Sequence, residues 1–253
     1  MVSGGDFRYN DNGFGRNRTA GCTTRFLPWR SFDKDIRMAV TARMERETLK
    51  YKIHRDISQQ ILEGCEGRLG VKIHPRWFSA GNVYPDCSHL RLWHLHELQT
   101  AGPMVERMIR RFCRRGIGSS HTLSRWRSFR LGIISHYICD FSCFVHTAAF
   151  DGTLREHRAY EQTQGLLMGS QCFRGVCSFY GAEDAAELTR LLEWTLESRD
   201  VRTYSPADDL DYAASVSTEA AYTMLRICMQ RRCSPATAWW GRLPGLRRLS
   251  RAS

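Results

Sequence analysis

The sequence predicts an all-α fold arranged as a single multi-helix bundle. Apolar residues recur every three or four positions in several long segments, which is the spacing that one buried helix face requires. Helix-start residues precede several of these segments. Almost no stretch alternates apolar and polar residues with β-branched side chains, as a half-buried strand would. At 253 residues, with 42% hydrophobic and 25% charged residues, the chain can bury one sizeable core.

The first predicted helix begins at Ser31, whose hydroxyl can cap it, and continues to a break near Gly64. A turn-rich stretch is expected over residues 67–85, because glycine, asparagine and proline gather there. A second helix should run from about 90 to 113 and end at the Arg-Arg-Gly of 114–116, a C-terminal signal.

A third helix should cover residues 119–144, starting at one of two adjacent serines. Its apolar and aromatic residues keep helical spacing, so it is expected to be strongly amphipathic or buried. A fourth helix is predicted over 154–167, and two more over 182–198 and 206–232. Ser205 supplies a capping hydroxyl before a proline at the first position of the last helix.

Three parts of the chain differ in composition. Residues 1–31 show no periodicity and are expected to be either a disordered extension or sequence upstream of the true start codon. Residues 32–233 form the predicted all-α domain, and residues 234–253 form a basic, irregular tail. The sequence contains no run of 18 apolar residues that could form a spanning helix, and it contains no apolar leader of the kind that directs export. The protein is therefore expected in the cytoplasm.

The formal net charge of +11 favours anionic partners such as phosphates, phospholipid headgroups or nucleic acid, although charge alone identifies no chemistry. The arginine-rich tail, with Trp239 and Trp240, is either a frayed terminus or a peripheral contact with an anionic membrane. The ten cysteines contain no C-x-x-C pair and are expected to be mostly buried thiols. If the protein were exported, Cys172 and Cys177 would be the first pair to test for a disulfide.

The segment over residues 136–161 carries the chemistry. His136 and Asp140 are four residues apart, as are His157 and Glu161. On a helix each pair lies on one face, one turn apart, where both side chains can reach one ion. Imidazole nitrogen and carboxylate oxygen are the ligand types that catalytic zinc accepts, with one position left for water. The two pairs therefore predict metal binding.

His146 extends the pattern. Ten residues along an α-helix is about 15 Å, so one ion cannot join His146 to His136, and at least two metals are implied. A single histidine on an apolar helix face is usually a satisfied core residue. Five ligand-type residues together are harder to explain in that way. Asp140 lies among aromatic residues, where a buried carboxylate costs several kcal/mol unless a partner or ion neutralises it.

The order H-x3-D-x5-H, a variable loop and H-x3-E, within the Leu-Gly-x3-His-Tyr context of 131–137, resembles the zinc-dependent phospholipases C. Fungal single-strand nucleases share that fold and its three-zinc site. The resemblance covers roughly residues 50–200. It implies an all-helical bundle of the zinc-dependent phospholipase C type, with Zn²⁺ as cofactor and a phospholipid or other phosphodiester as substrate.

The resemblance also implies a ligand set. His136 and Asp140 would hold one zinc with Asp86, which lies in a stretch similar to the family's Gly-x-x-x-Pro-Asp loop, and with a histidine. That histidine is best matched by His96, with His94 and His89 as the alternatives. The remaining roles concern two further zincs. His146, His157 and Glu161 would hold the second, and Asp140 would bridge to a third that is also bound by His54.

One departure concerns the third zinc. Exported family members bind it with the free amino group of an amino-terminal tryptophan, and Trp29 does not match that position. Two zincs are therefore expected, with a third site that is filled by another group, weakened or absent.

The expected reaction is hydrolysis of a phosphodiester. Water held between zincs would attack phosphorus in line, and the resemblance suggests that Asp86 orients or deprotonates that water. The expected enzyme is a phospholipase C-like hydrolase of phospholipid headgroup diesters. Two alternatives are a zinc-dependent single-strand nuclease and a non-catalytic metal-binding interaction protein on the same scaffold.

Overall fold

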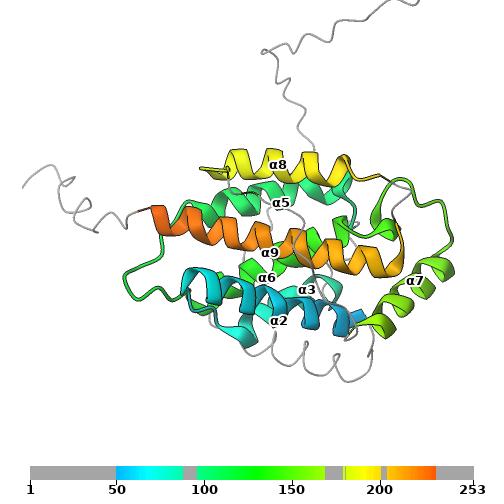
Figure 1. Ribbon diagram of the computed structural model, residues 1–253, viewed down its shortest axis with the longest axis horizontal. Helices are drawn as coiled ribbons and strands as arrows, with labels where there is room; N and C mark the ends of the chain where they lie inside the picture. The colour runs from blue at the N-terminus through cyan, green and yellow to red at the C-terminus, as the bar shows by residue number, and fades with distance from the viewer. Residues whose placement is uncertain (1–49, 88–95, 169–178, 180, 201–203, 232–253) are drawn as a thin grey trace, which may run out of the picture.

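Seven α-helices and one short 3-10 turn make up the regular structure of the part of the chain described by the computed structural model, which covers residues 50–87, 96–168, 179, 181–200 and 204–231 (Figure 1). The elements are α2 (Lys50–Leu69), α3 (Pro75–Cys87), α5 (Leu98–Cys113), α6 (Arg125–Phe141), η1 (Phe144–His146), α7 (Leu154–Leu167), α8 (Ala185–Glu197) and α9 (Pro206–Gln230). Over these residues the only β-type pairing is an isolated bridge between Lys72 and Thr122. The prediction of an all-α fold is confirmed.

Helix α6 is the centre of the bundle. It contacts α2, α3, α5 and α9, and α8 lies outside α5 (Figure 1). Thirteen of its 17 residues are buried, which is why its sequence is apolar on nearly every side. Of the two alternatives for the third predicted helix, amphipathic or buried, the structure shows a buried helix. The side chains at its carboxyl end lie in the interior of the bundle.

Helices α3 and α6 touch through their backbones. A Cβ atom on Gly132 of α6 would lie 2.1 Å from the carbonyl oxygen of Phe78, and one on Gly81 of α3 would lie 2.0 Å from that of Phe129. Side chains at both positions would force the helices apart. This contact packs the middle of α3 on the amino-terminal half of α6 and places the carbonyl of Asn82 beside His136.

Two predictions about the first half of the chain are wrong. Helix α2 does not break near Gly64, because this glycine makes room for Thr218 of α9, and the helix ends at Leu69 before Gly70 at φ +62°. Residues 67–85 are not a run of turns, because Pro75–Cys87 is helical. The glycine that suggested a turn serves helix packing instead, and Phe78 and Val83 face the core.

The boundaries of α5 and α6 also differ from prediction. Helix α5 begins at Leu98, because residues 96 and 97 form a bend, and the predicted start near residue 90 lies outside the described residues. Helix α6 begins after Ser124, whose hydroxyl accepts a hydrogen bond from the amide of Arg127, and not at residue 119 or 120. It ends at Phe141, and the chain then turns into η1. Thus the predicted single helix over residues 119–144 is wrong at both ends.

The last three helices follow the sequence more closely. Helix α7 has the predicted bounds and begins with a reciprocal capping box between Thr153 and Glu156. Asp184 caps α8 by accepting from two backbone amides. Ser205 caps α9, with Pro206 in its first turn, as predicted.

Several predictions fall outside the described residues. They concern the segment 1–31, the cap at Ser31, Trp29, the alternative ligands His89 and His94, the pair Cys172 and Cys177, and the tail 234–253. Of the six described cysteines, five are buried and Cys87 is partly exposed, and all six are free thiols. No helix over the described ranges combines the length and apolarity that crossing a bilayer would need.

Candidate metal centre

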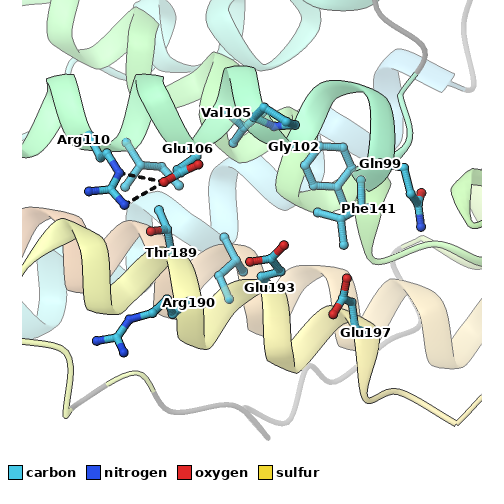
Figure 2. Close-up of a pocket in the computed structure, with 14 residues that line it drawn as sticks. Gln99, Gly102, Val105, Glu106, Arg110, Phe141, Thr189, Arg190, Glu193 and Glu197 are labelled. Carbon is cyan, nitrogen blue, oxygen red and sulfur yellow. Dashed lines mark hydrogen bonds and ion pairs between the residues drawn. The ribbon is translucent and has the colours of Figure 1, made fainter. Parts of the chain in front are cut away.

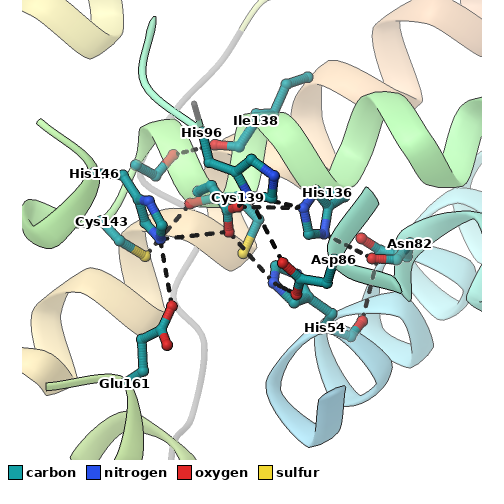
Figure 3. A network of polar contacts seen from close by, with 12 residues as sticks. His54, Asn82, Asp86, His96, His136, Ile138, Cys139, Cys143, His146 and Glu161 are labelled. Atoms are coloured by element: carbon teal, nitrogen blue, oxygen red, sulfur yellow. Dashed lines mark hydrogen bonds and ion pairs between the residues drawn. The ribbon is translucent and has the colours of Figure 1, made fainter. Parts of the chain in front are cut away.

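Five ligand-type side chains converge inside the bundle, and we call them the deep group (Figure 3). All five are buried. They come from α2, α3, the residues just before α5, and α6. The members of the deep group are His54, Asp86, His96, His136 and Asp140.

Asp140 is the common neighbour of three imidazoles in this group. Its Oδ2 lies 2.6 Å from Nδ1 of His96 and 3.2 Å from Nε2 of His136. Its Oδ1 lies 3.3 Å from Nε2 of His54. Asp86 closes the group, with carboxylate oxygens 3.8 Å from Nε2 of His54 and 3.8 Å from Nδ1 of His96. The predicted i,i+4 pair on α6 therefore meets residues from three other parts of the fold.

His136 is held in one orientation by α3. Its Nδ1 lies 2.8 Å from the carbonyl oxygen of Asn82. A carbonyl only accepts, so Nδ1 carries the hydrogen and a neutral ring turns the lone pair of Nε2 toward His96 and Asp140. Asn82 also donates through Nδ2 to Ser58 Oγ at 2.6 Å, which ties α3 to α2. Sequence reasoning missed Asn82, because it read the residue as part of a turn.

Burial and neighbouring charge set the protonation states of the pair on α6. Complete burial lowers the pKa of His136, and nearby Asp140 opposes that effect without reversing it. Burial alone would raise the pKa of Asp140, but the imidazoles of His136, His146 and His54 outweigh it and hold that pKa well below its usual range. A neutral imidazole and an ionised carboxylate are the states that a metal ion requires of its ligands.

Three further ligand-type residues form what we call the outer group, which consists of His146, His157 and Glu161. Oε1 of Glu161 lies 3.2 Å from Nε2 of His157 and 3.6 Å from Nε2 of His146. His146 comes from η1, whereas the other two lie one turn apart on α7. The outer group is nearer to solvent, since the side chain of His157 is 21% exposed and that of Glu161 is 14% exposed.

The two groups adjoin at Asp140. Nε2 of His146 lies 4.0 Å from Oδ1 of Asp140, and its ring centroid lies 6.1 Å from that of His96. The prediction that helical rise separates His146 from His136 rests on one continuous helix, and that premise is wrong. Because α6 ends at Phe141, η1 turns back and returns His146 to the same region. The structure thus brings together all eight residues predicted as ligands.

The donors fit zinc in both chemistry and spacing. Ligand atoms group into three sets, each with all atoms within 4.8 Å of one another: His54, His136 and Asp140; Asp86, His96 and His136; and His146, His157 and Glu161. Two nitrogens bound tetrahedrally at about 2.0–2.1 Å from zinc lie about 3.3–3.4 Å apart. Nε2 of His136 and Nδ1 of His96 face each other at 3.4 Å. These residues could therefore hold zinc without a large rearrangement.

A separate hollow of about 390 Å³ lies between α5 and α8 (Figure 2). Its lining includes the apolar side chains of Phe141 and Leu192, the carboxylates of Glu193 and Glu197, and the ion pair of Arg110 with Glu106. None of its lining residues is a histidine, an aspartate or a cysteine. The hollow therefore offers glutamate as its only carboxylate and no imidazole, unlike the metal centre, although Phe141 directly follows Asp140.

Fold and site together define an all-helical protein with a buried cluster of histidine and carboxylate ligands. The chain matches the family described as zinc dependent phospholipase C over residues 53–235, and it belongs to that family. Comparison with curated proteins and with solved structures gives no match. The resemblance seen in the sequence is confirmed. The family depends on zinc, which agrees with the predicted cofactor, whereas the number of ions stays a prediction.

Proposed function

We propose that this protein is a zinc-dependent phosphodiester hydrolase of the phospholipase C type, acting on the headgroup diester of a phospholipid. The observation that supports the proposal most is the meeting of the deep and outer groups at Asp140, in a chain that belongs to the zinc dependent phospholipase C family. A net charge of +11 favours the approach of an anionic phosphodiester.

We keep the ligand assignment that the family resemblance implies, in which each zinc draws most of its ligands from one of the three sets of donor atoms. His136, Asp140, Asp86 and His96 would hold one zinc. His146, His157 and Glu161 would hold a second. Asp140 and His54 are suited to a third. Bound zinc lowers the pKa of water toward neutrality and stabilises the charge that develops on a phosphate during its displacement.

The protein's own groups have separate tasks in this proposal. Asn82 holds Nδ1–H of His136, so that Nε2 stays available to the metal. Asp86, which is 2% exposed, would orient the attacking water and take its proton as the water oxygen bonds to phosphorus. The bond from phosphorus to the lipid oxygen breaks, and that oxygen takes up a proton and leaves as a hydroxyl. His157 and Glu161 are more exposed than any member of the deep group, so the phosphate would approach from their side.

The test combines metal content with turnover. Purified protein should contain zinc, and it should hydrolyse a chromogenic phosphocholine diester faster than it degrades single-stranded DNA. Preferential cleavage of the DNA would replace the proposal with a nuclease on the same fold. Full zinc loading with turnover of neither substrate would replace it with a non-catalytic metal-binding protein.

A further inference from the structure

Asp209 of α9 is a fully buried carboxylate that belongs to neither ligand group. Its Oδ2 accepts a hydrogen bond from the backbone amide of Phe144 at 2.7 Å and another from the hydroxyl of Tyr160 at 2.8 Å. Its Oδ1 lies 2.9 Å from Nη2 of Arg199. A single side chain on α9 therefore binds η1, α7 and the segment that follows α8.

Arg199 connects the same carboxylate to the end of α6. Its Nη1 donates to the carbonyl oxygen of Ser142, the residue that caps α6, at 2.7 Å. Its guanidinium carbon lies 4.2 Å from the ring centroid of Tyr204 and 4.2 Å from that of Tyr212. The side chain is thus fixed by stacking as well as by hydrogen bonds. Asp209 and Arg199 together hold both Ser142 and Phe144, the two residues between which the chain turns toward His146.

The same contacts reach the other arm of the outer group. Tyr160 directly precedes Glu161 and lies three residues after His157 on α7. The centroid of its ring lies 6.2 Å from the centroid of the Phe144 ring. Gln164, one turn further along α7, lies with Nε2 3.6 Å from Sγ of Cys143, which is the cap of η1. The separation between η1 and α7 is therefore set by side chains that are not themselves ligand candidates.

We propose that three side chains, those of Asp209, Arg199 and Tyr160, act as positioning residues. They hold His146 and Glu161 at the distance from each other that the zinc of the outer group requires. Apart from their contact with each other, Asp209 and Arg199 bind the polar groups of Phe144, Tyr160 and Ser142, which flank the outer ligands and are not ligands themselves. Burial raises the pKa of Asp209 in spite of these donors, so the carboxylate is kept at a cost to stability.

The inference rests on the proposed role of the outer group as metal ligands, and it does not depend on the reaction. Residues that orient the side chains bound directly to a metal typically contribute about 10- to 100-fold to metal affinity. Asp209→Asn keeps the size of the side chain but removes the charge that Arg199 faces and one of the acceptors. Tyr160→Phe removes only the hydroxyl that donates a hydrogen bond to Asp209, and it preserves the ring that packs against Phe144.

The experiment is a zinc competition titration of the full chain against a chromophoric chelator, in which each metal equivalent is counted. Asp209→Asn should lower the affinity for one zinc equivalent about 10- to 100-fold. Tyr160→Phe should lower the affinity for the same equivalent by a smaller factor. The remaining equivalents should bind as in the parent protein. Cobalt substitution should show the matching loss of one part of the visible absorption, a signature that a general loss of stability would not produce.

Leu188→Ala is the matched control. Leu188 is fully buried on α8, which packs on α5 and α9, so truncation should destabilise the fold without touching η1 or α7. The inference is overturned if both test variants bind every equivalent at parental affinity. It is also overturned if all equivalents weaken together or if Leu188→Ala loses the same equivalent. A parent protein that binds zinc but cleaves no diester would defeat the proposed function and leave this inference standing.

Discussion

The deep and outer groups use the same ligand types but are built in different ways. Four of the five members of the deep group lie on α2, α3 and α6, and α3 packs on α6 backbone to backbone. Each of the five is at most 8% exposed. The outer group lies on a three-residue turn and one helix at the edge of the bundle. Its geometry depends on a side-chain cluster centred on Asp209 rather than on helix packing. The deep group is therefore fixed by the fold itself, and the outer group by a few polar contacts.

This difference predicts how each group responds to change. Altering the helix contact between α3 and α6 should disturb the deep group, because Asn82 and Asp86 move with α3. Altering the Asp209 cluster should disturb the outer group alone. A change at Asp140 should affect both, because this carboxylate lies next to imidazoles of each.

Asp140→Asn should produce the largest effect. The substitution removes the only charge shared by the two groups, and turnover of a phosphodiester should fall about 1000-fold or more, because metal-bound charge stabilisation is worth several kcal/mol. Zinc content, measured by mass spectrometry of the digested protein, should fall as well. Asp151→Asn, at an exposed position in the loop before α7, is the matched control and should change neither quantity. Equal rates and zinc contents in the two variants would contradict the assignment of Asp140.

Gly132→Ala tests the helix contact that supports the deep group. The added methyl group would meet the backbone of α3 at Phe78, so the free energy of unfolding should fall by about 3 kcal/mol, as for other overpacked positions. Gly67→Ala, on the same type of element, meets nothing within 4 Å and should be neutral or slightly stabilising. Denaturant titration measures both. Equal stabilities would show that the close approach of α3 and α6 is not required.

The two groups should lose their metal at different rates. A chelator should strip the half-buried outer group first and the deep group more slowly, so that metal release, followed with a fluorescent zinc indicator, has two phases. Loss of a ligand present at 100 times its Kd costs about 2.7 kcal/mol, which lowers the melting temperature by about 5–10 °C in a domain of this size. A single release phase, or an unchanged melting temperature after complete removal, would argue against two unlike sites.

The metal-free protein should lose stability as the pH falls. Burial lowers the pKa of His136, so the unfolded state takes up its proton first, below the ordinary value of 6.5. The pKa of Asp140 is also lowered, so a second loss should begin below its ordinary value of 3.8. Both shifts make the folded state bind fewer protons than the unfolded state, and stability must therefore rise with pH. Melting temperatures of the metal-free protein that stay level from pH 7 to pH 5 would contradict the burial of a neutral His136.

The local parts of the site could be predicted from sequence. Spacing of four residues on a helix brings His136 to Asp140 and His157 to Glu161, and helix geometry makes that outcome independent of the rest of the fold. The predicted cap at Ser205 is equally local. The family resemblance added His54, Asp86 and His96, which spacing alone could not have selected. The structure places all three within 4 Å of another ligand candidate.

The remaining features depend on contacts between distant segments. Gly81 suggests a turn when read locally, and only the approach of Phe129 from α6 shows that it lies in a helix. The return of His146 to Asp140 follows from the end of α6 at Phe141, which no strong stop signal marks. Asp209 looks like an ordinary polar residue in the first turn of α9. Its role becomes visible only when Phe144 and Tyr160 are seen around it.

Anomalous diffraction at the zinc absorption edge, on crystals of the purified protein, tests the central claim most directly. Imidazole and carboxylate groups from four helices and η1 should surround separate zinc peaks, with ligand atoms at about 2.0–2.2 Å. One peak should lie between His136 and Asp140, and another among His146, His157 and Glu161. Zinc bound elsewhere, or strong diffraction with no peak at either position in zinc-loaded crystals, would contradict the claim.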